Sequence, residues 1–112
     1  MNWLQISINY PKAFSKLEQW GNHPAVLSRQ KKRLLYNFFD ENKIFLWVEP
    51  EIQYTRDIDE DGNNPHYVVE SWSYMIHNNR ITLFSNSGFK NRTKAEGKAF
   101  TKAFGILNDK LK

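Results

Sequence analysis

The sequence predicts an α+β fold in which a three-stranded antiparallel sheet, a meander, has helices packed on one face, in the order αα-βββ-α. Three observations predict it. Apolar residues recur at helical spacing before residue 40 and after residue 92, they alternate between residues 44 and 85, and Asn78-Asn79 is typical of a tight hairpin turn. With eight Phe, four Trp and five Tyr, the 112 residues can build the core of one domain spanning residues 1–112.

Two helices are predicted before the sheet. The first begins at Asn9-Tyr10-Pro11 and ends near Gly21, and its apolar residues are Ala13, Phe14, Leu17 and Trp20. The second begins near Ser28, or earlier at Pro24, and its apolar stripe is Leu34, Leu35, Phe38 and Phe39. A start near Ser28 would put four cations in the first turn, where the helix dipole disfavours them, so either the helix starts earlier or these cations serve another purpose.

Three strands follow, over residues 44–49, 67–76 and 80–85, with a polar loop over residues 56–66. Pro50 indicates that the first strand is an edge strand or contains a bulge. The Asn78-Asn79 turn sets Ile76 opposite Ile81 and Tyr74 opposite Leu83. The predicted core face is therefore Trp72, Tyr74, Ile76, Ile81 and Leu83, and the predicted outer face holds Phe45, Trp47, Met75 and Phe84.

The last helix is predicted from a capping box, Thr93-Lys94-Ala95-Glu96, and from a buried stripe of Phe100, Ala103, Phe104, Leu107 and Leu111. Gly97 and Gly105 each weaken this helix by about 1 kcal/mol relative to Ala, and small residues there allow close packing.

Charge is strongly segregated along the chain. Residues 1–43 hold seven Lys or Arg against three Asp or Glu, residues 44–85 hold two against seven, and residues 86–112 hold seven against two. A dipolar surface of this kind can steer a charged partner.

Several kinds of chemistry are excluded or disfavoured. The absence of Cys excludes disulfides, Cys-ligated zinc and thiol catalysis. Residues 57–63 match the start of a calcium loop, but the twelfth position, which should be Glu, is Val68, so a solvated acidic loop is the preferred interpretation. No catalytic residue, metal site or cofactor is predicted, and an enzyme, such as a small hydrolase, would need a closed pocket of converging acid and base groups. The sequence shows neither a signal peptide nor a long apolar run, which predicts a cytoplasmic protein without a membrane partner.

The basic residues form two candidate nucleic-acid-binding groups. The first is a ladder of Lys94, Lys98 and Lys102 on the last helix, preceded by Lys90 and Arg92, and the second is Arg29, Lys31, Lys32 and Arg33. Together they can follow a phosphate backbone with a salt-dependent attraction. The alternative is a solubilising face opposite an apolar stripe.

The outer sheet face is the second candidate surface. Its side chains, Phe45, Trp47, Met75 and Phe84, can stack on bases or form an interface with a host or phage protein or a second copy. A third possibility is that Trp3, Leu4 and Ile6 cover them.

Two resemblances add to this interpretation. Residues 35–42, 91–96 and 99–104 resemble small uncharacterised proteins encoded by phages and prophages, which implies a host-takeover, DNA-metabolism or partner-inhibiting role. The order of a helix, three antiparallel strands and a helix, with Arg92 and Lys94 at the start of the last helix, is similar to the double-stranded RNA-binding domain, although Thr93 and Glu96 replace expected lysines. The prediction is a non-enzymatic binding module for nucleic acid; the alternative is a protein–protein adaptor or inhibitor.

Overall fold

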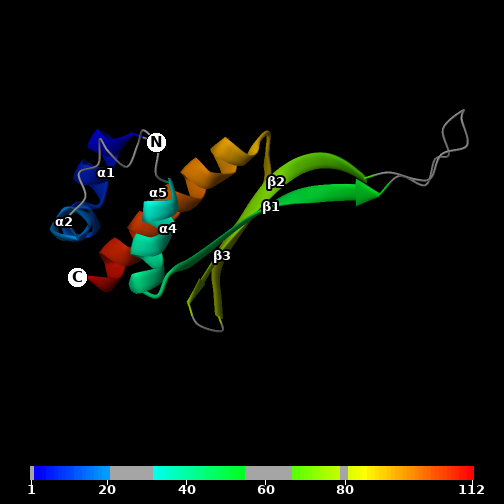
Figure 1. Ribbon diagram of the computed structural model, residues 1–112. Helices are drawn as coiled ribbons and strands as arrows, with labels where there is room; N and C mark the ends of the chain where they lie inside the picture. The colour runs from blue at the N-terminus through cyan, green and yellow to red at the C-terminus, as the bar shows by residue number, and fades with distance from the viewer. Residues whose placement is uncertain (1, 21–31, 55–66, 79–80) are drawn as a thin grey trace, which may run out of the picture.

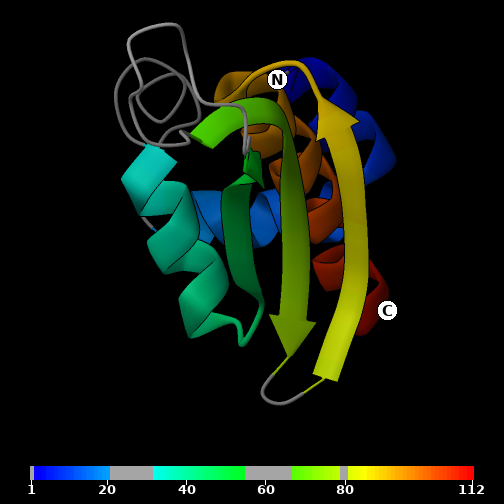
Figure 2. The same cartoon turned by 90° about the vertical axis from the view of Figure 1, so that its right-hand side faces the viewer.

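A computed structural model describes residues 2–20, 32–54, 67–78 and 81–112 of the chain. In chain order the elements are α1 (Trp3–Asn9), α2 (Pro11–Gln19), α4 (Lys32–Glu41), β1 (Phe45–Tyr54), β2 (Tyr67–Asn78), β3 (Ile81–Phe89) and α5 (Arg92–Lys110). The strands form one antiparallel sheet in the order β1-β2-β3, and the helices gather on one side of it (Figure 1). Figure 2 looks onto the other face of the sheet, which none of the described helices covers. The predicted fold class is confirmed.

Phenylalanines from α4 and α5 form the centre of the core. Phe38, Phe39, Phe100 and Phe104 are all fully buried. The rings of Phe39 and Phe104 meet edge to face with centroids 4.9 Å apart, an arrangement that aromatic quadrupoles favour. The apolar stripes predicted for these two helices therefore face the core.

A buried amide joins α2 to α5. Pro11 is the first residue of α2, as predicted, but Tyr10 makes no side-chain cap. Instead the Oδ1 atom of Asn108 in α5 accepts hydrogen bonds from the backbone N–H groups of Lys12 (2.9 Å) and Ala13 (3.2 Å). Because the first N–H groups of a helix have no intrahelical partner, these two bonds fix the start of α2 against α5.

The helix α1 is an addition to the predicted order. Asn2 caps it, since its Oδ1 accepts a hydrogen bond from the Gln5 backbone N–H at 3.2 Å. Ile6 is buried in the core, and the ring of Trp3 lies 5.9 Å from that of Phe104. The N-terminal segment therefore packs on the helical side, and the interpretation in which it covers the outer sheet face is wrong.

The register of β3 differs from the prediction. Tyr74 and Ile76 of β2 are buried, as expected, but Ile81 and Leu83 are 67% and 41% exposed. Asn78 pairs with Ile81, and a shift between Ile76 and His77 then sets Ile76 opposite Phe84. A shift of one residue moves strand side chains to the opposite face. Phe84 therefore packs on the core, and Leu83 takes its place on the outer face.

The first strand is longer than predicted and continues through Pro50 to Tyr54. It is an edge strand, and its register shifts between Glu51 and Ile52. Both features agree with the interpretation of Pro50, because proline cannot donate to a sheet and is found at edges and bulges.

Candidate nucleic-acid interface

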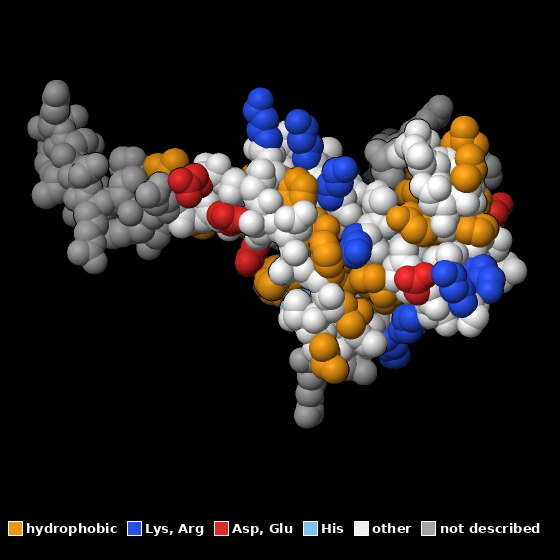
Figure 3. Space-filling model, turned by 180° about the vertical axis from the view of Figure 1, so that it is seen from behind, with side chains coloured by type: hydrophobic (Ala, Val, Ile, Leu, Met, Phe, Trp, Pro, Cys, Tyr) orange, Lys and Arg blue, Asp and Glu red, His pale blue; other side chains and the backbone are white. Residues whose placement is uncertain are grey.

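The helix α5 presents three lysines on one face. Residues four apart lie above one another on a helix, and Lys94, Lys98 and Lys102 are all exposed. The opposite face is buried, through Ala95, Ala99, Phe100, Ala103, Phe104 and Leu107. Figure 3 shows Lys and Arg side chains in a row over this helix. We call Lys94, Lys98 and Lys102 the lysine ladder.

The start of α5 is set by Asn91 and not by the predicted capping box. The Asn91 Oδ1 accepts a hydrogen bond from the Lys94 backbone N–H at 2.9 Å, and the helix begins at Arg92. Thr93 and Glu96 therefore lie inside the helix, and the prediction of a capping box at these residues is wrong. Asn is as good an N-cap as Ser or Thr. Because Asn91 lies two residues before Thr93, Glu96 lies further inside the helix, and its side chain is turned inward and not toward the cap.

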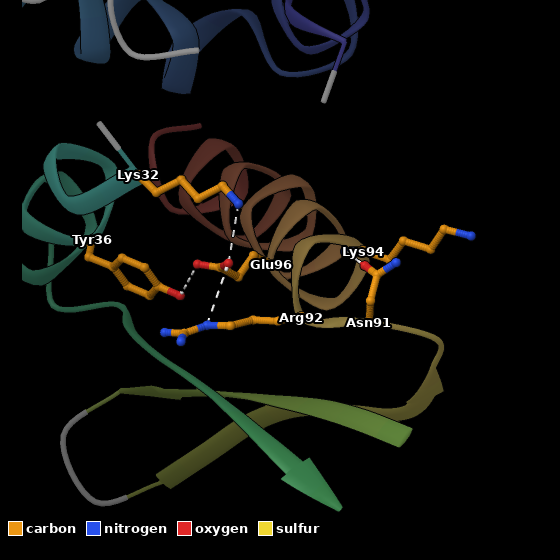
Figure 4. A network of polar contacts seen from close by, with 6 residues as sticks. All are labelled: Lys32, Tyr36, Asn91, Arg92, Lys94 and Glu96. Atoms are coloured by element: carbon orange, nitrogen blue, oxygen red, sulfur yellow. Dashed lines mark hydrogen bonds and ion pairs between the residues drawn. The ribbon is translucent and has the colours of Figure 1, made fainter. Parts of the chain in front are cut away.

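The Glu96 carboxylate is the centre of a polar cluster between α4 and α5 (Figure 4). Its side chain is only 7% exposed. The Oε1 atom lies 3.3 Å from Lys32 Nζ and 3.7 Å from Arg92 Nε, and the Tyr36 hydroxyl donates to Oε2 at 3.0 Å. Burial, and then the nearby Glu96 charge, raise the pKa of Tyr36 above its ordinary value. Lys32 and Arg92, whose side chains are 50% and 63% exposed, thus each form an ion pair with Glu96, which reduces the charge they offer to a phosphate.

The predicted basic residues that the structure describes lie on different elements. Of the described candidates, Lys94, Lys98 and Lys102 gather on a single helix face, while Lys90 is exposed two residues before α5 and Arg33 is exposed on α4. Arg29 and Lys31 lie outside the described residues. The basic surface that the structure supports is centred on α5.

On its sheet side the ladder ends over an aromatic ring. Lys102 Nζ lies 4.2 Å from the centroid of the Phe84 ring, a cation–π contact. Phe84 in turn stacks with Tyr74, with ring centroids 6.0 Å apart. The prediction that Phe84 belongs to the outer face is wrong, because the register shift turns this ring toward α5.

On the other side the ladder borders a cleft between α1 and α5 with a volume of about 470 Å³. Its lining residues are Asn2, Gln5, Ile6, Asn9, Tyr10, Lys94, Gly97, Lys98 and Thr101. This site was not predicted from the sequence, because the helix α1 was not predicted. The available signal was Asn2 as a cap followed by Trp3, Ile6 and Tyr10 at helical spacing.

The outer sheet face keeps most of its predicted members. Phe45 and Trp47 are 36% and 58% exposed, and Met75 lies opposite Trp47 in the register of β1 and β2. The Trp47 indole N–H donates to the Glu49 carboxylate at 3.0 Å. This face therefore combines exposed aromatic rings with a carboxylate.

Among the described residues, no group of three or more His, Asp or Glu side chains is placed to hold a metal ion. The acidic segment Asp57–Asn63 lies outside those residues. None of the described helices is both long and apolar enough to cross a membrane. Comparisons of this chain with protein-family models, with curated proteins and with solved structures found no match.

Proposed function

We propose that this protein is a non-enzymatic binding module that binds nucleic acid through the lysine ladder of α5. The observation that carries the proposal is the exposure of Lys94, Lys98 and Lys102 along one face of a helix whose buried Glu96 points away from them. A helix rises 1.5 Å per residue, so neighbouring ladder lysines are spaced about 6 Å apart. Lysines in such a row can neutralise successive phosphates and release the counterions condensed on them.

Further features support this surface. The exposed Lys90 adds a cation at the N-terminal end of the ladder. The only acidic residues of α5 are the buried Glu96 and the exposed Asp109, near the opposite end of the helix. A phosphate backbone lying along residues 90–102 would therefore meet no exposed carboxylate of this helix. From the sequence resemblance alone, we also propose that the chain derives from a phage or another mobile element.

The test is to measure, by fluorescence anisotropy at several salt concentrations, how tightly the protein binds a fluorescein-labelled oligonucleotide. The oligonucleotide is used both as a single strand and as a duplex. Replacing Lys94, Lys98 and Lys102 together by Gln should lower the affinity about tenfold or more at about 50 mM salt, and each lost contact should reduce the salt slope by about one.

A matched control is available on α2. Lys16→Glu and Lys98→Glu make the same charge change at exposed helix positions, but Lys16 lies outside the ladder. Lys98→Glu should weaken binding several times more than Lys16→Glu does. Equal effects would indicate a response to net charge only, and absence of binding to single strands and duplexes at low salt would remove the proposal.

The uncovered sheet face favours a second function, the binding of a protein partner. Trp47, Phe45 and Leu83 expose apolar surface there, and the three strands contain Glu49, Glu51 and Glu70 but no Lys or Arg. We propose that the partner presents aliphatic side chains with Lys or Arg, because guanidinium and ammonium groups pair with the Glu49 carboxylate and stack on the Trp47 ring.

This second function is tested with Trp47→Ser, using Lys98→Glu as the control on the other surface. A partner that binds the immobilised protein should be lost with Trp47→Ser, kept with Lys98→Glu, and released by salt. Light scattering after size exclusion shows whether the partner is a second copy of this chain. A dimer that dissociates with Trp47→Ser would mean that the outer face binds another copy and not the proposed basic partner. A partner that Trp47→Ser leaves bound would contradict the proposal.

A further inference from the structure

The cleft between α1 and α5 is built from residues of distinct chemistry on its two walls. The α1 side contributes the carboxamides of Asn2, Gln5 and Asn9, and the α5 side contributes the ammonium groups of Lys94 and Lys98. Ile6 and Tyr10 supply apolar surface. None of the described residues that line it is Asp or Glu. The cleft therefore suits a ligand that is anionic at one end and has flat polar edges at the other.

Several polar atoms in the cleft remain available to a ligand. The Asn2 Oδ1 is occupied by its cap, and the Thr101 hydroxyl donates to the Gly97 carbonyl at 2.9 Å. The side chains of Gln5 and Asn9 are exposed. A carboxamide has both donors and an acceptor, so these two groups can meet the hydrogen-bonding edge of a nucleobase.

The size of the cleft fits one nucleotide and excludes a double helix. A volume of about 470 Å³ lies within the range of sites for small molecules and cofactors. A base that is paired and stacked within a duplex cannot enter such a cleft, whereas an unpaired base can leave its stack at little cost.

We propose that the α1–α5 cleft binds one unpaired nucleotide of a single-stranded nucleic acid, with its base toward Gln5 and Asn9 and its phosphate on Lys94 and Lys98. This inference rests on the proposed nucleic-acid function and makes it specific for single strands. Lys94 and Lys98 belong to both the cleft and the ladder, so the strand leaves the cleft along α5 toward Lys102. The Tyr10 ring and Ile6 give the base an apolar wall, as in other sites for single strands.

Gly97 allows the cleft to be blocked without changing any charge. A Cβ atom built at Gly97 would meet nothing within 4 Å, so a side chain at this position enters open space without a backbone clash. Gly97→Met should fill part of the cleft and leave every lysine in place, while Gly97→Ala adds one methyl group and serves as the matched control.

The probes are a fluorescein-labelled oligothymidylate and a duplex, both measured by anisotropy at several salt concentrations. The wild-type protein should prefer the single strand. Gly97→Met should weaken single-strand binding about tenfold, the loss expected when one stacked base is excluded, with the duplex affinity and the salt slope unchanged. Gly97→Ala, which adds a single methyl group, should weaken single-strand binding much less than Gly97→Met does.

A second variant keeps the test valid if Gly97→Met fails to fold, which circular dichroism would detect. Gln5→Ala combined with Asn9→Ala changes only exposed side chains of α1, and it should reduce single-strand affinity several-fold with the same salt slope. Full single-strand affinity in the folded variants, or a preference of the wild-type protein for duplex, would overturn the inference. In either case, if Lys98→Glu still weakens binding, the proposed nucleic-acid function is retained.

Discussion

The helical side of the molecule and the outer face of its sheet carry opposite charge for a structural reason. The helix α5 has five Lys or Arg residues and turns Glu96 inward, whereas the strands contain three Glu and no Lys or Arg. A helix can bury a carboxylate on one face while residues four apart expose cations on the other face. On a strand, side chains alternate, so Trp47 and Glu49 share one face and form a hydrogen bond. One small domain thus offers a basic surface and a separate acidic, aromatic one.

The largest expected difference between these regions is in the cost of losing an aromatic ring. Phe104 is fully buried and contacts the rings of Trp3, Phe38 and Phe39. Phe104→Ala should lower the free energy of unfolding by about 3–5 kcal/mol, measured by urea denaturation. Trp47→Ala, at a site 58% exposed, should cost less than about 1 kcal/mol. A similar loss at both sites would show that the outer face is covered in solution.

A second comparison concerns one carboxylate from each region. Glu96→Ala should lower the free energy of unfolding by about 2 kcal/mol, because it leaves the Tyr36 hydroxyl and the Lys32 and Arg92 cations without their shared acceptor. Glu49→Ala removes only the bond from Trp47 at the surface and should cost about 0.5 kcal/mol or less. The measurement is again denaturation at neutral pH. Equal costs would mean that the Glu96 cluster does not stabilise the junction of α4 and α5.

The sequence predicted the helical side better than the sheet face, and the reason is physical. The buried faces of α4 and α5 follow from spacing within each helix, so Phe38, Phe39, Phe100 and Phe104 could be assigned without knowing their neighbours. The face of β3 depends on its register with β2, and the shift between Ile76 and His77 has no mark in the sequence. For this reason Phe84 and Leu83 were assigned to the wrong faces.

The candidate sites also differ in how far they could be predicted from the sequence. The spacing of Lys94, Lys98 and Lys102 suffices to place them on one helix face. The engagement of Lys32 and Arg92 depends on Glu96, which the predicted capping box would have placed at the start of the helix. The α1–α5 cleft needs two elements that are far apart in the chain, and α1 has only Ile6 as a buried residue. The ladder, which lies on one helix, was predictable, whereas the Glu96 cluster and the cleft, each made by two helices, were not.

A smaller effect should appear at alkaline pH. Burial and the Glu96 charge raise the pKa of Tyr36, so its hydroxyl stays protonated in the folded protein while an unfolded tyrosine ionises near pH 10. Unfolding above about pH 10 then releases a proton, and stability falls as the pH rises. The free energy of unfolding should therefore decrease more steeply with pH in the wild-type protein than in Tyr36→Phe. The pKa of Tyr74 is also raised, but Tyr74 is present in both proteins. Identical slopes would contradict the role given to Tyr36.

The smallest effects come from the two glycines of α5, which differ only in what faces them. Gly97→Ala should raise the free energy of unfolding by about 0.5–1 kcal/mol, because Ala favours the helix and its methyl group enters the open cleft. At Gly105 an added Cβ would lie 3.2 Å from Tyr10 Cε1, so the same helix-forming gain is opposed by a contact that the ring must move to relieve. Gly105→Ala should therefore be less stabilising than Gly97→Ala, or destabilising, in thermal denaturation followed by circular dichroism. Removing the ring in Tyr10→Ala should bring the effect of Gly105→Ala up to that of Gly97→Ala. If Gly105→Ala is instead as stabilising as Gly97→Ala in the presence of Tyr10, then Tyr10 does not pack on α5 and the wall it gives to the cleft is absent.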